Sequence, residues 1–161
     1  ETMTASAYGD IAPSDAPVLA LDGGVSVRVI AGASHGTSGA VARPTTEPIV
    51  LDIELPPGAQ FDAELPAGHN AFVYVYAGGV DVGAESTTRV DAERMAILAN
   101  DPAADGERLR AADGIVEPAR VLLVAGKPLG EPIAQYGPFV MNTTQQIEEA
   151  FADFRRGALA G

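Results

Sequence analysis

Short apolar stretches separated by turn-forming residues recur along most of this chain. β-Branched and aromatic residues are enriched in these stretches, and Gly–Gly, Pro–Gly or Asp–Gly pairs fall between many of them, which is typical of strands joined by turns. Many short strands with few helical patterns predict an all-β sandwich or barrel. The expected strands are Val25–Ile30, Pro48–Leu55, Gln60–Leu65, Asn70–Ala77, Arg94–Leu98 and Arg120–Ala125.

The most regular of these stretches alternates between two apolar faces. One face carries Ala71, Val73 and Val75, and the other carries Phe72, Tyr74 and Tyr76. Because both faces are apolar enough to be covered, we expect a central strand. The phenol groups need polar partners or water. The aromatic face is therefore expected either to line a barrel mouth or to lie at the edge of the core with its hydroxyls in solvent.

One helix is predicted, over residues 142–157 at the end of the chain. Threonine and asparagine side chains precede an apolar stripe with i, i+3, i+4, i+7 spacing, and Gly157 follows it, as in a capped helix. The stripe consists of Ile147, Ala150, Phe151 and Phe154. We expect this helix to pack on a barrel formed by residues 18–141. Residues 1–17 are expected to form an N-terminal arm or a former inter-domain linker.

The composition excludes several classes of function. The 161 residues include 22 Asp and Glu against 10 Lys and Arg. Such an acidic surface repels phosphate groups, so direct binding to nucleic acid or to an anionic membrane is not expected. The chain has no cysteine, which excludes disulfides, thiolate metal ligands and cysteine nucleophiles. With no secretory signal and no transmembrane stretch visible in the sequence, we expect a cytoplasmic protein.

Several blocks of the sequence closely resemble the C-terminal domain of the pirin family. The most specific block is Tyr136–Thr143, and the stretches Gly68–Val75 and Val27–Gly32 match in the same order. The resemblance implies a two-cupin protein whose N-terminal barrel binds a ferrous-type metal through His side chains and a Glu. Some bacterial members are quercetin 2,3-dioxygenases, and eukaryotic members are iron-dependent transcriptional co-regulators that act through protein contacts.

The fold that this resemblance implies is a cupin, that is, a double-stranded β-helix or jelly-roll-like barrel. The chain starts at Glu1, where the first barrel of the family is expected to have ended, and contains none of that barrel's metal motif. We therefore expect a fragment of a bicupin. Iron or another divalent metal is expected in the N-terminal cupin and no cofactor in this chain.

The imidazoles of this chain do not form a cupin metal motif. A cupin site needs two His at i and i+2, a Glu a few residues later and another His, whereas the corresponding stretch 58–69 holds only His69. The other imidazole, His35, lies in a loop rich in Gly and Ser. Residues 101–106 resemble the start of a calcium loop, but Ala112 stands where the bidentate Glu belongs, so we expect a turn.

We accordingly predict no catalytic, cofactor-binding or metal-binding residue in this chain. His69 is expected to be a hydrogen-bonded turn residue at the entrance of a strand, with a ligand or inter-domain contact as the alternative. Tyr74 and Tyr76 are further candidates for such contacts. A third hypothesis is that the tyrosine face binds a small molecule.

Two functions remain open at this point. In the first, the domain is a non-catalytic cupin that supports or covers the N-terminal metal-binding cupin and offers an acidic protein-interaction surface. In the second, it is half of a bicupin quercetin 2,3-dioxygenase whose chemistry belongs to the N-terminal domain. The expected partners are that N-terminal cupin of the same protein and, beyond it, other proteins.

Overall fold

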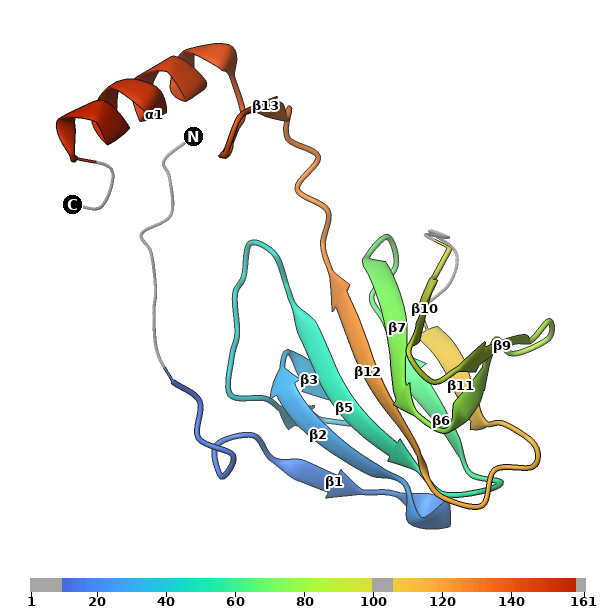
Figure 1. Ribbon diagram of the computed structural model, residues 1–161. Helices are drawn as coiled ribbons and strands as arrows, with labels where there is room; N and C mark the ends of the chain where they lie inside the picture. Colours follow the sequence, from blue (N-terminus) through green and yellow to red (C-terminus); the bar gives the residue numbers. More distant parts are fainter. Residues whose placement is uncertain (1–9, 100–105, 159–161) are drawn as a thin grey trace. The chain divides into compact units, whose positions relative to one another are not determined.

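The computed structural model describes residues 10–99 and 106–158, most of them in β-strands and their turns (Figure 1). The chain divides into two compact units, Glu1–Pro128 and Leu129–Gly161. No helix of the described residues is long and apolar enough to cross a membrane. The calcium-loop stretch 101–105 and residues 1–9 of the expected arm lie outside the described residues.

The larger sheet of the first unit has the strand order β1-β2-β5-β12-β7-β10, and all of its neighbouring strands pair antiparallel. Side chains of its long strands alternate between buried and accessible positions, as expected for a sheet with one face on a core. The strands are β1 (Val18–Ala20), β2 (Ser26–Ala31), β5 (Ile49–Leu55), β12 (Ala119–Gly126), β7 (Asn70–Ala77) and β10 (Arg94–Ile97).

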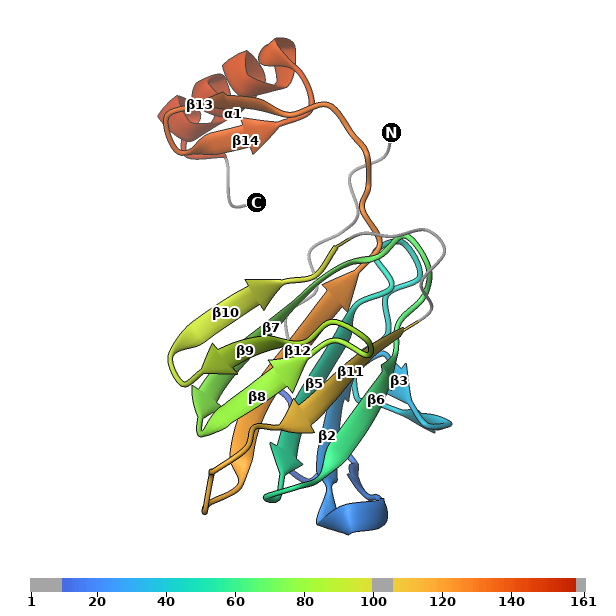
Figure 2. The same cartoon turned by 90° about the vertical axis from the view of Figure 1, so that its right-hand side faces the viewer.

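A smaller sheet lies face to face with the larger one, as Figure 2 shows, and has the order β6-β11-β8-β9. Its strands are β6 (Gln60–Glu64), β11 (Gly106–Ala111), β8 (Gly79–Val82) and β9 (Thr88–Asp91). The core fills the space between the two sheets. Its largest fully buried side chains include Leu51, Ile53 and Leu123 from the larger sheet and Leu109 from the smaller one.

Short elements complete the first unit. A 3-10 turn, η1 (Asp22–Gly24), precedes β2, and a two-stranded ribbon of β3 (Ala33–Ser34) and β4 (Thr37–Ser38) follows it. The bulge of β2 near its end and the parallel bridge between Ala31 and Val41 hold the following loop against the sheet.

The six strands expected from the sequence are confirmed within one or two residues at each end. Strands β8, β9 and β11 were not predicted, and they make up most of the smaller sheet. Their outward side chains are charged, and only alternate positions such as Val80, Val82 and Leu109 are buried. Two charged pairs cross this outer face, Arg108 with Asp62 and Arg110 with Asp81. Short strands with so few apolar residues give only a weak periodic signal.

The predicted central strand is confirmed, since β7 lies between β12 and β10. The expectation that both its faces are covered is wrong for this chain. Val73 and Val75 are in the core, whereas Tyr74 and Tyr76 lie on the outer face of the larger sheet and are partly exposed. The aromatic face therefore does not line the barrel mouth, because the interior is already filled by β-branched residues from both sheets.

The second unit consists of a hairpin, β13 (Ala134–Tyr136) and β14 (Phe139–Met141), and the helix α1 (Thr144–Arg156). The predicted cap is confirmed: the Thr143 hydroxyl accepts from the Gln146 amide, and the Gln146 side chain accepts from the Thr143 amide. Gly157 ends the helix with a φ of 68°.

The apolar stripe of α1 packs on its own hairpin. Ile147 and Ala150 are buried. The Phe151 ring lies edge-on to Phe139 and Tyr136, with centroid separations of 4.8 and 5.6 Å. Residues 129–141, which the sequence assigned to the barrel, thus share a compact unit with the helix. Packing of the helix on the barrel remains a prediction.

Candidate functional site

His69 occupies the turn that leads into β7. Its amide donates to the carbonyl of Pro66 at 3.2 Å, and Gly68 beside it has a φ of 81° that favours glycine. This chain path directs the imidazole inward, and only 4% of the side chain is exposed. His69 therefore occupies the strand entrance, as the sequence suggested.

The imidazole of His69 is joined to a carboxylate from another loop. Its Nε2 lies 3.3 Å from Oε2 of Glu47, and Oε1 of Glu47 accepts from the Lys127 ammonium at 3.2 Å. A carboxylate can only accept, so Nε2 of His69 donates in this contact. Nδ1 has no hydrogen-bond partner, although it is buried.

The hydrogen bond and the charge of Lys127, together with the bond from His69, hold the pKa of Glu47 below its usual value of 4.5. The carboxylate is therefore ionised at neutral pH. Glu47 sits in the left-handed region, with a φ of 43°, which is uncommon for a residue with a side chain. Its amide donates to the Arg43 carbonyl at 2.8 Å, and the amide of Lys127 donates to the Thr46 carbonyl at 2.8 Å. The amide of Lys127 and its ammonium, which donates to Glu47, thus fasten the loop to the end of β12.

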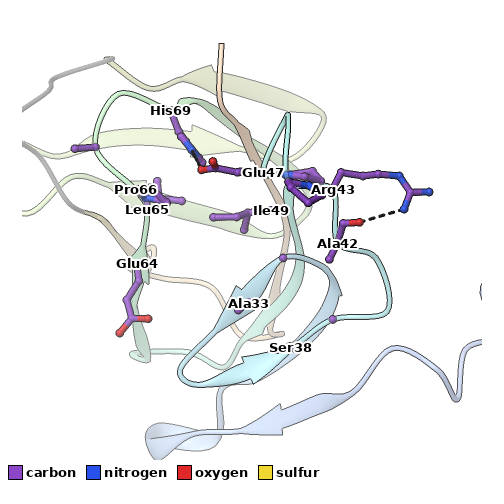
Figure 3. Close-up of a pocket in the computed structure, with 15 residues that line it drawn as sticks. Ala33, Ser38, Ala42, Arg43, Glu47, Ile49, Glu64, Leu65, Pro66 and His69 are labelled. Atoms are coloured by element: carbon purple, nitrogen blue, oxygen red, sulfur yellow. Dashed lines mark hydrogen bonds and ion pairs between the residues drawn. The ribbon is translucent and has the colours of Figure 1, made fainter. Parts of the chain in front are cut away.

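Glu47 and His69 line a cavity of about 680 Å³ in the first unit. Figure 3 shows their side chains pointing toward one another beside Ile49, Leu65 and Pro66. The rest of the wall is mostly apolar, and the guanidinium of Arg43 is turned to the carbonyl of Ala42. A cavity of this volume with few polar groups is typical of small-molecule sites.

Two glycines allow the loop after β2 to form one side of this cavity. A Cβ on Gly39 would lie 2.9 Å from the carbonyl oxygen of Val29, and a Cβ on Gly32 only 2.5 Å from that of Pro48. The backbone can approach the sheet this closely only without side chains. The amide of Gly39 donates to the carbonyl of Gly32 at 2.7 Å and closes the loop.

The residues of this cavity do not fit a catalytic iron. Such a metal needs two His and a carboxylate with open positions beside them. Here a single imidazole is already bonded to Glu47, and the Lys127 ammonium beside the same carboxylate would repel a cation. Among residues 10–99 and 106–158, no group of three His, Cys, Asp or Glu side chains could hold a metal ion. That this chain has no metal site remains a prediction.

The second imidazole of the chain belongs to His35, which lies in the turn between β3 and β4. His35 has a φ of 46°, its Nδ1 lies 3.0 Å from the Ser34 hydroxyl, and its ring lies 5.4 Å from that of Phe61. It does not line the cavity that holds His69. The structure thus gives the two imidazoles separate partners.

The candidates Tyr74 and Tyr76 lie outside this cavity, on the outer face of the larger sheet. The register places Tyr74 beside Met95 and Phe72 beside Ile97 and Val124. Around Phe72, Met95, Ile97 and Val124 the surface is hollowed by about 700 Å³. We call this set of residues, with Tyr74, the apolar face. It is a second feature that points to binding, because monomeric proteins rarely leave such patches open.

Tyr76 has a different environment from Tyr74. Its hydroxyl donates to Oδ1 of Asp52 at 2.6 Å. Burial, followed by this hydrogen bond and the charge of Asp52, raises the pKa of Tyr76 to about 12. The phenol is therefore held neutral as a donor, and its polar end is satisfied within the sheet rather than free for a ligand.

Sequence reasoning identified His69 but missed Glu47 and Lys127. Glu47 stands between Thr46 and Pro48 in a stretch without periodicity, and Lys127 is 80 residues away from it. Neither residue has a local signal that marks it as functional, because the contact between them depends on the pairing of β5 with β12.

Comparisons with known proteins identify related sequences. A family model described as the Pirin C-terminal cupin domain matches residues 50–160. A Pseudomonas aeruginosa protein provisionally named quercetin 2,3-dioxygenase is 45% identical over 98% of this chain and 54% of its own length. A pirin-like protein of Caulobacter vibrioides is 39% identical over 96% of this chain and 53% of its own length. Human pirin is 32% identical, over 96% of this chain and 51% of its own length.

Solved structures share the same fold. A crystal structure of quercetin 2,3-dioxygenase from Acinetobacter baumannii is 34% identical, with a TM-score of 0.81 over 99% of this chain and 52% of that chain. A protein from Geobacillus kaustophilus is 26% identical, with a TM-score of 0.70 over 81% of this chain and 50% of that one. The predicted all-β, jelly-roll-like cupin fold is confirmed. The chain spans about half the length of the curated relatives it matches.

Proposed function

Because this chain belongs to the pirin family and matches its C-terminal cupin domain, we propose that it is a non-catalytic cupin that covers and supports a metal-binding N-terminal cupin. In this proposal the metal, iron or another divalent ion, belongs to the N-terminal barrel. This domain contributes an apolar face for the other barrel and an acidic surface for further protein partners. The chemistry of the whole protein is not assigned to any residue of this chain.

The observation that carries the proposal is the apolar face. Ile97 is 79% exposed and Met95 is 54% exposed, and they lie opposite Phe72 and the partly exposed Tyr74 on β7. Full burial of a side chain of this kind stabilises a protein by about 1.5–3 kcal/mol relative to leaving it in water. Ile97 and Met95 do not contribute this free energy while they stay exposed. A second apolar surface placed on this face would recover part of it.

The lengths of the relatives indicate which partner covers the apolar face. Each of the three curated relatives named above has a further half that this chain does not match. An N-terminal cupin joined to the same chain is present at high effective concentration and needs only a modest contact area to stay docked. Tyr74 belongs to this face, which supports its candidacy as an inter-domain contact.

A chimaera tests this docking. The N-terminal half of the Pseudomonas aeruginosa relative is placed before this chain, and its thermal unfolding is followed by calorimetry. We expect one cooperative transition. The Ile97→Asp variant should give two separate transitions, because a carboxylate buried without a partner opposes docking. Val116→Asp is the matched control, since Val116 is equally accessible, at 86%, in a loop outside the apolar face. Two transitions in the unaltered chimaera would contradict the proposal.

A second function is favoured by the similarity to two proteins named as quercetin 2,3-dioxygenases. Here the domain is half of a bicupin quercetin 2,3-dioxygenase whose metal site lies in the N-terminal barrel. Oxygen uptake with quercetin separates the two proposals. Uptake by an iron-loaded two-cupin protein, with none by this chain alone, supports the dioxygenase. No uptake by either supports a purely non-catalytic protein, and uptake by this chain alone contradicts both.

A further inference from the structure

We propose that the cavity beside Glu47 binds a small neutral molecule with an apolar body and one N–H or O–H group. This group donates a hydrogen bond to the Glu47 carboxylate. This site is separate from the apolar face and goes beyond the proposed structural role, so either proposal can fail without the other.

The polar end of the site is the carboxylate of Glu47. Lys127 occupies one position on Oε1 and His69 one on Oε2, whereas an ionised carboxylate offers about four. The Glu47 side chain is still 44% exposed and lines the cavity. Its carboxylate therefore has acceptor positions beyond the two that Lys127 and His69 occupy.

Two local features that destabilise the fold involve the Glu47 carboxylate. Glu47 holds a left-handed backbone, and the buried Nδ1 of His69 is left without a partner while Nε2 is directed at Glu47. Each feature opposes folding. Burying a leucine in place of His69 would avoid the second cost. Both features are explained if binding requires an ionised carboxylate at this point of the cavity.

The walls and the charges decide the class of ligand. Ile49, Leu65 and Pro66 offer apolar surface to the body of the molecule. The charge of Glu47 is balanced by Lys127, so the ligand needs a donor rather than a positive charge. A second carboxylate, Glu64, also lines the cavity, and the chain carries a net charge of −12. Both oppose an anionic ligand.

Indole and 1-methylindole form the matched probe pair, because they share an apolar ring and only indole can donate a hydrogen bond. The chain, labelled with ¹⁵N, is titrated with each probe and followed by amide chemical shifts. We expect indole to shift the amides of residues 32–49 and 64–69 and to bind at least fivefold more tightly than 1-methylindole. Indole-3-acetate, an anion, should bind more weakly than indole.

Three variants locate the contact. Glu47→Met, which removes both acceptor oxygens, should bring the affinities for indole and 1-methylindole to within twofold of each other, whereas the exposed control Glu117→Met should keep the preference. Ala67→Phe, which fills the cavity from its accessible wall, should abolish binding of both probes. Amide spectra of each variant without ligand check that the fold is kept.

Three results would overturn the proposal. The first is no binding of indole at 5 mM, a concentration at which even a weak fragment site of about 4 kcal/mol is mostly filled. The second is equal affinity of the two probes for the unaltered chain. The third is a set of shifts centred on the apolar face around Ile97, which would place the ligand on the outer sheet instead.

Discussion

Nε2 of His69 lies 3.3 Å from Oε2 of Glu47, across 22 residues of sequence. The contact links the entrance of β7 to the loop before β5, and Lys127 at the end of β12 completes it from the other side. Three strand ends of the larger sheet therefore meet at one carboxylate. This arrangement makes Glu47, rather than the imidazole alone, the polar centre of the cavity.

Replacing His69 tests how much this contact stabilises the first unit. His69→Ala removes one hydrogen bond to a charged group and leaves a small void, while it also removes the orphaned Nδ1. We expect a net loss of about 1–2 kcal/mol in the free energy of unfolding, measured by urea denaturation. The pKa of Glu47 should rise toward 4.5 but stay below it, because Lys127 is the larger cause of its depression.

Metal content after dialysis should remain far below one equivalent in both proteins. A stoichiometric transition metal that is lost in the variant would contradict the absence of a metal site.

The cap of α1 offers a test confined to the second unit. Thr143→Ala removes the hydroxyl that accepts from the Gln146 amide, and we expect a loss of about 1 kcal/mol. Thr144→Ala is the control, because Thr144 is the first helical residue and its side chain is exposed. Helical ellipticity at 222 nm during thermal unfolding measures the effect. Equal effects of the two substitutions would mean that the cap contributes nothing.

The ion pair between Asp62 and Arg108 predicts a pH dependence of stability. The two residues are directly opposite on β6 and β11, and the guanidinium binds both carboxylate oxygens, at 2.6 and 3.3 Å. The hydrogen bond from Arg108 lowers the pKa of Asp62 below 3.8. The stabilisation is therefore fully present above about pH 4 and is lost as the pH falls through the folded-state pKa.

Asp62→Asn should accordingly lower stability at pH 7 by about 0.5 kcal/mol, the range of exposed pairs. At pH 2 the difference between variant and parent should be smaller, because the carboxyl group loses its charge as the pH falls through its folded-state pKa. Urea unfolding at the two pH values measures both differences. A deficit of the variant that is the same at pH 2 as at pH 7 would show that the charge of Asp62 is not its cause.

The hydroxyl of Tyr76 should ionise only well above pH 10. Its pKa of about 12 has burial as the first cause and the bond to Asp52 as the second. Asp52→Asn keeps an acceptor for the hydroxyl but removes the charge, so the pKa should fall by a fraction of the shift and remain above 10. The ring ¹³C shifts of Tyr76, followed from pH 8 to 12.5 in both proteins, measure it. Because the folded-state pKa is raised, the stabilisation is present below pH 10 and disappears as the pH rises through 12.

The parts of this protein that its sequence determined are those with a strong local signal. Strand β7 followed from the alternation of Val73 and Val75 with aromatic residues, and the helix from its stripe and its cap at Thr143, because a period or a cap needs only neighbours in the chain. The Tyr136–Thr143 block carried the family resemblance for the same reason.

Only the tertiary structure decided which face of β7 meets the core and where the polar centre of the cavity lies. Both faces of β7 are apolar, so alternation alone cannot choose between them, and the choice depends on what the opposite sheet supplies, such as Phe61 and Leu109. Glu47 has no pattern around it. It acquires its role because antiparallel pairing of β5 with β12 brings Lys127 beside it and because the turn at Gly68 aims His69 at it. Contacts made across 22 and 80 residues are set by strand pairing, which no local period encodes.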